Sequence, residues 1–132
     1  MKDVFDRTSI EGSARYFQNC VRNGDVENAI DCFDDQAIYV TGIGTFVTGK
    51  ENIRKAIEQV CALKPDLQAQ RSTRFTVDNI TSWVDEWTLK AILPDGTKLD
   101  LKGTSSDILK KQTNGNWVYL VDNPYGADYL NQ

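Results

Sequence analysis

Three polar side chains lie in the last two strand-like stretches of the chain, where apolar residues would be expected. They are Asp107, Asp122 and Asn123. A carboxylate that faces a core must be paired, hydrogen-bonded or held neutral. These residues indicate a polar site within a sheet, and Asp107 is the first candidate for a general acid or base. The alternative is structural: Asp107 could bond a nearby hydroxyl or Arg71, and the other two could cap the turn at Pro124.

Strand alternation assigns these candidates to faces of the sheet. On the last strand it places Tyr119 and Asn123 on one face and Asp122 on the other. In the stretch 67–77 it places Arg71 on the face of the apolar residues. An inward Arg71 could pair with a buried aspartate or bind an anionic ligand group. A register shift would instead turn it into solvent, and the sequence leaves both readings open.

Aromatic side chains could line a pocket for a flat apolar ligand, because they combine large rigid area with a polar handle. Core packing or a dimer face is the alternative role. With the polar candidates, the predicted ligand-binding residues are Phe17, Tyr39, Arg71, Trp83, Trp87, Asp122 and Asn123. The predicted catalytic residues are Asp107 and Tyr16.

The composition excludes several classes of function. The chain of 132 residues contains no histidine, so Ser-His-Asp and Cys-His catalysis are excluded and the usual ligand of zinc or copper is missing. We expect no metal and no cofactor. The net charge of -4 argues against nucleic acid. No apolar stretch predicts a membrane span or signal peptide, so the expected location is cytoplasmic. We interpret Cys20, Cys32 and Cys61 as buried free thiols.

The hydrophobic period predicts the elements that position these residues. Apolar stripes at helical spacing cover residues 10–21, 26–33 and 53–63, and Pro65 ends the third helix. Short strands are predicted at residues 37–40 and 45–48. From residue 67 the period changes to two, and an Asn114-Gly115 turn joins the last two strands. We predict one α+β domain over residues 1–132, with three helices packed on the concave side of a curved antiparallel sheet.

Four segments in this order resemble the SnoaL-like or ketosteroid isomerase-like branch of the nuclear transport factor 2-like superfamily. They are NGDVENAIDCFDDQAIYV at 23–40, TGKENIRKAI at 48–57, WTLKAILPDG at 87–96 and GTSSDILKKQTNGNWVYLVDNPYG at 103–126. The resemblance implies a cone-like, cystatin-like fold that admits a small, mostly apolar ligand. It also implies a homodimer formed through the sheet.

The resemblance further implies where catalytic residues would lie. The family's aspartate base falls at Val40, which cannot take a proton, and its tyrosine falls at Phe17, with Tyr16 one residue away. A histidine of related branches falls at Asn123. The nearest function is proton transfer of the isomerase, cyclase or dehydratase type, with Asp107 moving the proton and Tyr16 or Asn123 stabilising charge on a carbonyl oxygen. The alternatives are a non-catalytic ligand-binding module and a dimeric interaction module.

Overall fold

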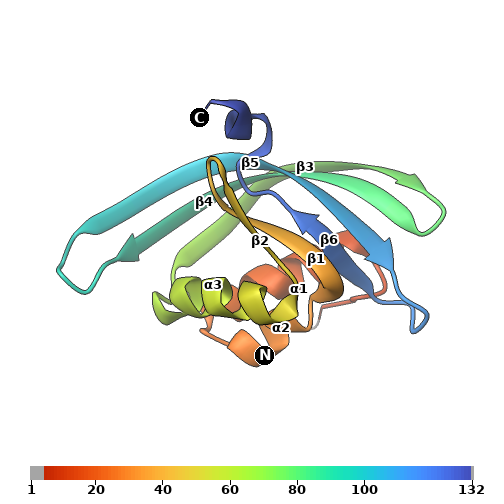
Figure 1. Cartoon of the computed structure of the whole chain (residues 1–132), viewed down its shortest axis with the longest axis horizontal. Helices are drawn as coiled ribbons and strands as arrows, with labels where there is room; N and C mark the ends of the chain where they lie inside the picture. Colours follow the sequence, from red (N-terminus) through yellow and green to blue (C-terminus); the bar gives the residue numbers. More distant parts are fainter. Residues whose placement is uncertain (1–4, 132) are drawn as a thin grey trace.

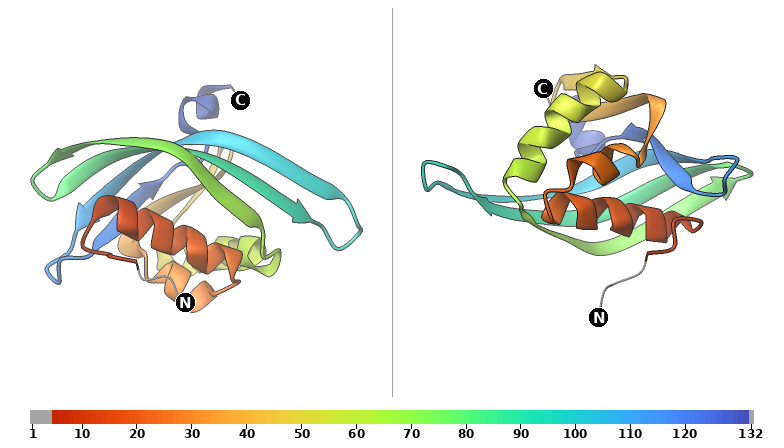
Figure 2. Two further views of the ribbon diagram at one scale, coloured as in Figure 1. Left: turned by 180° about the vertical axis from the view of Figure 1, so that it is seen from behind. Right: turned by 90° about the horizontal axis from the view of Figure 1, so that it is seen from below.

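In the computed structural model, which describes residues 5–131, one curved sheet of six strands lies against three helices (Figures 1 and 2). The helices are α1 (Ile10–Arg22), α2 (Val26–Ile30) and α3 (Lys50–Ala62). The strands are β1 (Phe33–Gly42), β2 (Thr45–Thr48), β3 (Asp66–Val77), β4 (Ile80–Ile92), β5 (Lys98–Lys111) and β6 (Trp117–Asp122), followed by the 3-10 turn η1 (Gly126–Leu130). The predicted α+β fold, with helices on the concave side, is confirmed.

The sheet order is β2-β1-β6-β5-β4-β3. Every neighbouring pair is antiparallel except β1 and β6, which run parallel. The sheet is therefore mixed, whereas the sequence predicted antiparallel strands throughout. The reason is that β1 pairs with the last strand of the chain, a long-range partner that no local turn specifies. The hairpin between β5 and β6 forms at the predicted turn, where Gly115 has a φ of 91°.

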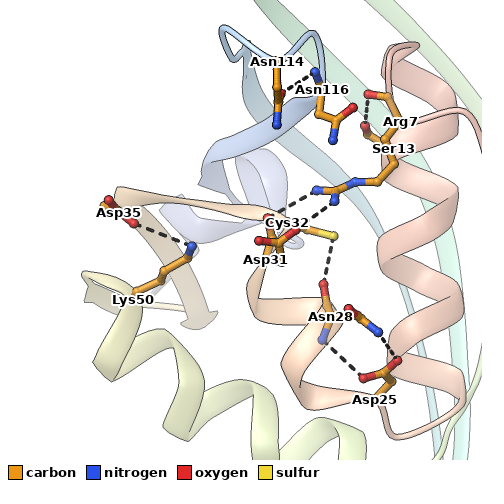
Figure 3. Close-up of polar contacts among 10 residues, drawn as sticks. All are labelled: Arg7, Ser13, Asp25, Asn28, Asp31, Cys32, Asp35, Lys50, Asn114 and Asn116. Carbon is orange, nitrogen blue, oxygen red and sulfur yellow. Dashed lines mark hydrogen bonds and ion pairs between the residues drawn. The ribbon is translucent and has the colours of Figure 1, made fainter.

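Side-chain caps fix where the first two helices begin. The Oγ of Ser9 accepts a hydrogen bond from the Gly12 N–H at 2.9 Å, which satisfies one of the free donors of α1. Asp25 does the same for α2 and also accepts from the Asn28 side-chain amide at 2.7 Å (Figure 3). These caps mark the starts of two helices that only three residues separate.

The segment before α1 is tied to the rest of the fold through Arg7. Its carbonyl accepts from the Ser13 hydroxyl at 2.8 Å and from the Trp117 N–H at 2.9 Å. Its guanidinium bonds Asp31 at 2.9 Å (Figure 3). One residue therefore joins α1, the end of α2 and the start of β6.

Among the register shifts of the sheet, two β-bulges, on β3 and β6, interrupt the alternation that the sequence suggested for the site residues. On β3, Ala69 pairs with Trp87 and Ser72 pairs with Asp85, so β3 has one extra residue between these pairs. On β6, Tyr119 pairs with Leu109 and Val121 pairs with Ile108, which leaves Leu120 as the extra residue. Each bulge reverses the face of the residues that follow it.

The three cysteines are buried free thiols, as predicted. Burial raises the pKa of the Cys32 thiol to about 12, which keeps it protonated and unreactive. Across residues 5–131, no helix combines the length and apolar character needed to cross a membrane.

Candidate functional site

A cavity of about 200 Å³ lies between the concave face of the sheet and the helices α1 and α3. Its wall is mostly apolar. Apolar side chains from α1, α3, β3, β4 and β5 contribute to it, namely Val21, Ile57, Val60, Leu63, Leu67, Leu89, Leu99 and Leu101. The polar groups are concentrated on β4, β5 and β6, where Asp85, Ser105, Asp107 and Asp122 reach the cavity. A concave, mostly apolar wall with a few converging polar groups is typical of a small-ligand site.

Asp107 and Asp122 form a buried carboxyl pair on neighbouring strands. They are 3% and 6% exposed. Burial raises the pKa of Asp107 to about 7, although the Ser105 hydroxyl and the Asn123 N–H stabilise its charged form at 2.8 Å each. Burial and the negative charge of Asp107 raise the pKa of Asp122 well above its ordinary value. At neutral pH Asp122 is therefore the protonated partner and donates its hydrogen bond to Asp107.

The bulge at Leu120 creates this pair. Simple alternation would have placed Asp122 on the face opposite to Tyr119, as the sequence predicted. With Leu120 as an extra residue, Tyr119 and Asp122 both face the cavity, and Val121 faces outward with Ile108. The prediction that these two side chains lie on opposite faces is wrong for that reason.

Asp85 is the third buried carboxylate of the concave face, and it is held by a cation. The Arg15 guanidinium of α1 contacts its two oxygens at 2.8 and 3.2 Å, and the Gln18 amide donates at 3.1 Å. The guanidinium also stacks over the Trp83 ring at 5.6 Å. Asp85 and Ser105 are directly paired across β4 and β5. The Asp85 carboxylate therefore lies diagonally across from Asp107, which is two residues beyond Ser105 on β5, and its charge adds to the rise in the Asp107 pKa.

Two tyrosines add neutral hydroxyl groups to the cavity. Tyr119 lies on β6, and Tyr39 on β1 is the direct strand partner of Asp122. Burial raises the pKa of both phenols above the ordinary value, and the nearby aspartates raise it further. Both hydroxyls are thus protonated at neutral pH and available as hydrogen-bond donors.

The structure brings together most of the predicted ligand-binding residues. Phe17, Tyr39, Trp87 and Asp122 line the cavity with Asp107. The Trp87 indole N–H donates to the Pro124 carbonyl at 2.8 Å, which anchors the chain after β6 over the sheet.

Other predicted residues lie outside the cavity wall. Trp83 is fully buried in the core. Asn123 holds the following turn, because its side-chain oxygen accepts from the N–H groups of Tyr125 and Gly126. It acts on the site through its backbone N–H, which bonds Asp107.

Arg71 and Tyr16 were predicted at the site, and the structure places both elsewhere. The β3 bulge turns Arg71 to the convex face, where its side chain is 84% exposed and pairs with Glu86. Ser72 takes the inward place. Tyr16 packs beside Phe5 and under the Arg7 guanidinium, 5.0 Å from its ring centre. One helical residue of offset rotates it about 100° away from Phe17, which lines the cavity instead.

Sequence reasoning missed the polar side chains that α1 contributes. Arg15 and Gln18 are three residues apart and flank the apolar stripe that contains Phe17. A cation and an amide bordering a buried helical face, opposite a strand with an inward aspartate, were the available signal. Tyr119 and Tyr125 were also missed. Tyr119 faces the cavity because its strand partner is Leu109, which lies on the same face as Asp107, and the turn after β6 positions Tyr125.

The arrangement supports proton transfer. A carboxyl group with a pKa near 7 can both accept and release a proton at neutral pH, and a protonated neighbour can donate to a developing negative charge. Within residues 5–131, no group of three or more His, Cys, Asp or Glu side chains is placed to hold a metal ion.

Residues 14–119 match the family model of the SnoaL-like domain. A search of curated proteins gives no match. Among solved structures, the chain is similar to a nuclear transport factor 2-like superfamily protein from Salmonella enterica serovar Typhimurium, with 14% identity, a TM-score of 0.80 and coverage of 91% of this chain and 89% of that one.

Two further solved structures share the fold. One is a candidate scytalone dehydratase from Novosphingobium aromaticivorans, with 12% identity, a TM-score of 0.78 and coverage of 86% and 78% of the two chains. The other is a candidate calcium/calmodulin dependent protein kinase II association domain from Xanthomonas campestris, with 15% identity, a TM-score of 0.76 and coverage of 89% and 84%. At these identities the similarity establishes the fold alone.

The ion pair of Arg15 and Asp85 should contribute strongly to stability. Replacing Arg15 with Gln leaves a buried carboxylate without its cation, so we expect the free energy of unfolding in urea to fall by about 2–4 kcal/mol. The matched control is Arg71→Gln, which removes the exposed pair with Glu86 and should cost less than about 1 kcal/mol. Equal losses in the two variants would contradict this assignment.

The carboxyl pair should make stability depend on pH. The folded-state pKa of Asp107 is raised from 3.8 to about 7, so the folded chain binds more protons than the unfolded chain between these values. The free energy of unfolding should therefore fall as pH rises from about 4 to about 7. The double variant Asp107→Asn/Asp122→Asn should flatten this slope in urea titrations, whereas the surface change Asp100→Asn should preserve it. A wild-type stability that rises over this range would refute the pairing.

Proposed function

Given that this chain belongs to the SnoaL-like domain family, we propose that it binds a small, largely apolar carbonyl compound and moves a proton on it with Asp107. The observation that carries the proposal is the buried pair of Asp107 and Asp122 at the wall of an apolar cavity. Burial brings the pKa of Asp107 close to neutral pH and keeps Asp122 protonated. General acid–base catalysis requires such a division of roles.

The chemistry follows from these protonation states. The ionised fraction of Asp107 accepts a proton from the carbon next to the carbonyl group, and the electron pair of the broken C–H bond moves to the carbonyl oxygen. The resulting enolate oxygen accepts hydrogen bonds from the protonated Asp122 and from the Tyr39 or Tyr119 hydroxyl. With a β,γ-unsaturated substrate, Asp107 returns the proton to the γ-carbon of the dienolate and completes an isomerisation. With a β-hydroxy substrate, Asp107 gives the proton to the departing hydroxyl group, which leaves as water and completes a dehydration.

The cavity wall supports this reaction in two ways. Its leucines, with Val21 and Ile57, exclude water, which strengthens every hydrogen bond to the enolate. Asp85 raises the proton affinity of Asp107 further, and Arg15 keeps that third carboxylate paired. The candidate scytalone dehydratase among similar structures is compatible with this class of reaction.

One observation favours the non-catalytic alternative. Both oxygens of Asp107 already accept hydrogen bonds, from Ser105 and from the Asn123 backbone, as a purely structural carboxylate would. Val40 and Phe17 also stand where the resemblance places the base and the tyrosine. In that case the cavity would bind a ligand without turning it over, and a catalytic assay separates the two functions.

Proton exchange provides that assay without knowledge of the natural substrate. A panel of small cyclic enones and ketones is incubated with the protein in D₂O, and deuterium incorporation next to the carbonyl is followed by NMR. We expect exchange that increases with pH and levels off above about 7, as Asp107 ionises. Asp107→Asn should lower the rate by about 10²–10⁴-fold.

Two variants control this experiment. Asp122→Asn retains a donor at its position and should lower the rate much less than Asp107→Asn, whereas Asp100→Asn, on the surface, should not change it. Circular dichroism verifies folding. An Asp107→Asn variant that is folded and exchanges protons as fast as the wild type, or a wild type no faster than buffer, would refute the catalytic role.

We also propose that the chain forms a homodimer through the convex face of its sheet. Four exposed apolar side chains gather there, on β3, β4 and β5, and we name them the convex patch: Phe75, Val77, Ile80 and Ile108. The β3 bulge turns the first two outward. A contiguous apolar patch on a sheet is typical of a protein interface. The candidate kinase association domain among similar structures supports an assembly role for this fold.

The dimer predicts a mass of twice the 14.9 kDa chain by light scattering after size exclusion. Phe75→Glu places a charge within the convex patch, at its most exposed aromatic residue, and should yield a monomer. Ile43→Glu introduces the same charge at an exposed apolar residue in the turn between β1 and β2, away from the patch, and should leave the dimer intact. A monomeric wild type, or a dimeric Phe75→Glu variant, would contradict the proposal.

A further inference from the structure

A second hollow lies outside the cavity, between α3 and the hairpin of β1 and β2. It is an open groove of about 490 Å³. Val47 on β2 and Ala56 on α3 give it apolar sides, and Asn52, Lys55 and Gln59 supply polar groups along the helix. None of these five residues belongs to the cavity wall.

The groove adjoins the cavity. Four residues line both of them: Tyr39, Thr41, Val60 and Leu63. Tyr39 is the strand partner of Asp122, so the groove begins one strand away from the carboxyl pair. A molecule bound at Asp122 can therefore extend past Tyr39 and Val60 into the groove without crossing a strand or a helix.

The charge in the groove comes from Lys55. On a helix with about 100° per residue, Asn52 and Gln59 lie on the groove side of Lys55, whereas Glu51 and Glu58 lie on its opposite flank. The pocket-lining residues of α3 follow this division. Within residues 5–131 no ion pair involves Lys55. Its ammonium group is thus available at the edge of the groove next to two side-chain amides.

The cavity alone is small for a substrate. At about 200 Å³ it exceeds only modestly the roughly 150 Å³ of an engineered apolar cavity that accommodates benzene. A compact ring with its carbonyl oxygen at Asp122 nearly fills it. A substituent that the cavity cannot hold must extend beyond it, and the residues that the cavity shares with the groove, Tyr39 and Val60 among them, mark a place where it can do so.

We propose that the groove is a second subsite of the same ligand and that it binds an anionic tail, a carboxylate or a comparable oxygen group, through Lys55 with Gln59 and Asn52. This inference rests on the proposed function, since it places the ring of the ligand at the carboxyl pair. It defines the substrate class as amphipathic: a small carbonyl-bearing ring joined by a short apolar chain to an acid. Val47 and Ala56 contact the chain, and the tail oxygens accept from the lysine and the amide of Gln59.

The test uses p-cresol and a series of 4-hydroxyphenyl alkanoic acids with two to five methylene groups. The phenol oxygen imitates an enolate oxygen at the carboxyl pair, and the chain length samples the path into the groove. Affinities are measured by NMR chemical-shift titration. We expect the acid of best length to bind about tenfold more tightly than p-cresol and than its own uncharged methylamide.

Two lysine variants test whether Lys55 is responsible for the tighter binding of the acid. Lys55→Gln should remove the tenfold difference and leave the affinity for p-cresol unchanged. Lys102→Gln carries the same change of charge on the convex face of β5, since its neighbour Leu101 faces the cavity, and should change neither affinity.

The outcomes separate this inference from the proposed function. If p-cresol binds but no acid binds more tightly, or if Lys55→Gln keeps the gain, the groove subsite is refuted and the cavity proposal stands. If neither p-cresol nor any acid shifts the resonances of cavity residues and the enones show no exchange, both are refuted.

Discussion

Two carboxyl groups buried side by side cannot both be ionised, and this constraint determines the candidate site. At about 4 Å, two like charges near a protein surface repel by about 4 kcal/mol, and burial adds a further penalty for each charge. The pair of Asp107 and Asp122 responds by retaining a proton on Asp122. The remaining charge on Asp107 is stabilised by Ser105 and by the N–H of Asn123. The register of β5 against β6 must hold for all of these contacts to exist together.

Asp85 is also a buried carboxylate, and an ion pair with a helix stabilises it. The Arg15 guanidinium of α1 lies 2.8 Å from one of its oxygens and forms a buried ion pair with it. Asp85 also affects the carboxyl pair, because its negative charge raises the pKa of Asp107. Arg15 thus connects the packing of a helix to the proton affinity of a group on the sheet. A displacement of α1 would change the electrostatics of the cavity as well as its shape.

Local patterns predicted the element order, the end of the third helix, the hairpin turn and the burial of Asp107, because each depends on residues close in sequence. They did not predict the parallel pairing of β1 with β6 or the two bulges, which arise from contacts between distant segments. A bulge inserts one extra residue into a strand, so the side chains that follow it point to the opposite face of the sheet. For that reason Arg71 was placed inward and Asp122 was separated from Tyr119, while Asp107, on an unbulged part of its strand, was placed correctly.

A structural role for Asp107 does not exclude proton transfer, since each carboxylate oxygen has a second lone pair beyond the one that accepts from Ser105 or Asn123. The two roles differ in what they require. An asparagine at position 107 could accept the same backbone N–H with its side-chain oxygen, and it would carry no charge to be buried beside Asp122. The titratable pair lowers stability as pH rises toward 7, and the contact that an amide would lose is the one in which the second oxygen accepts from the Ser105 hydroxyl. A destabilising group held in a cavity by several hydrogen bonds is the pattern expected when function, rather than folding, requires it.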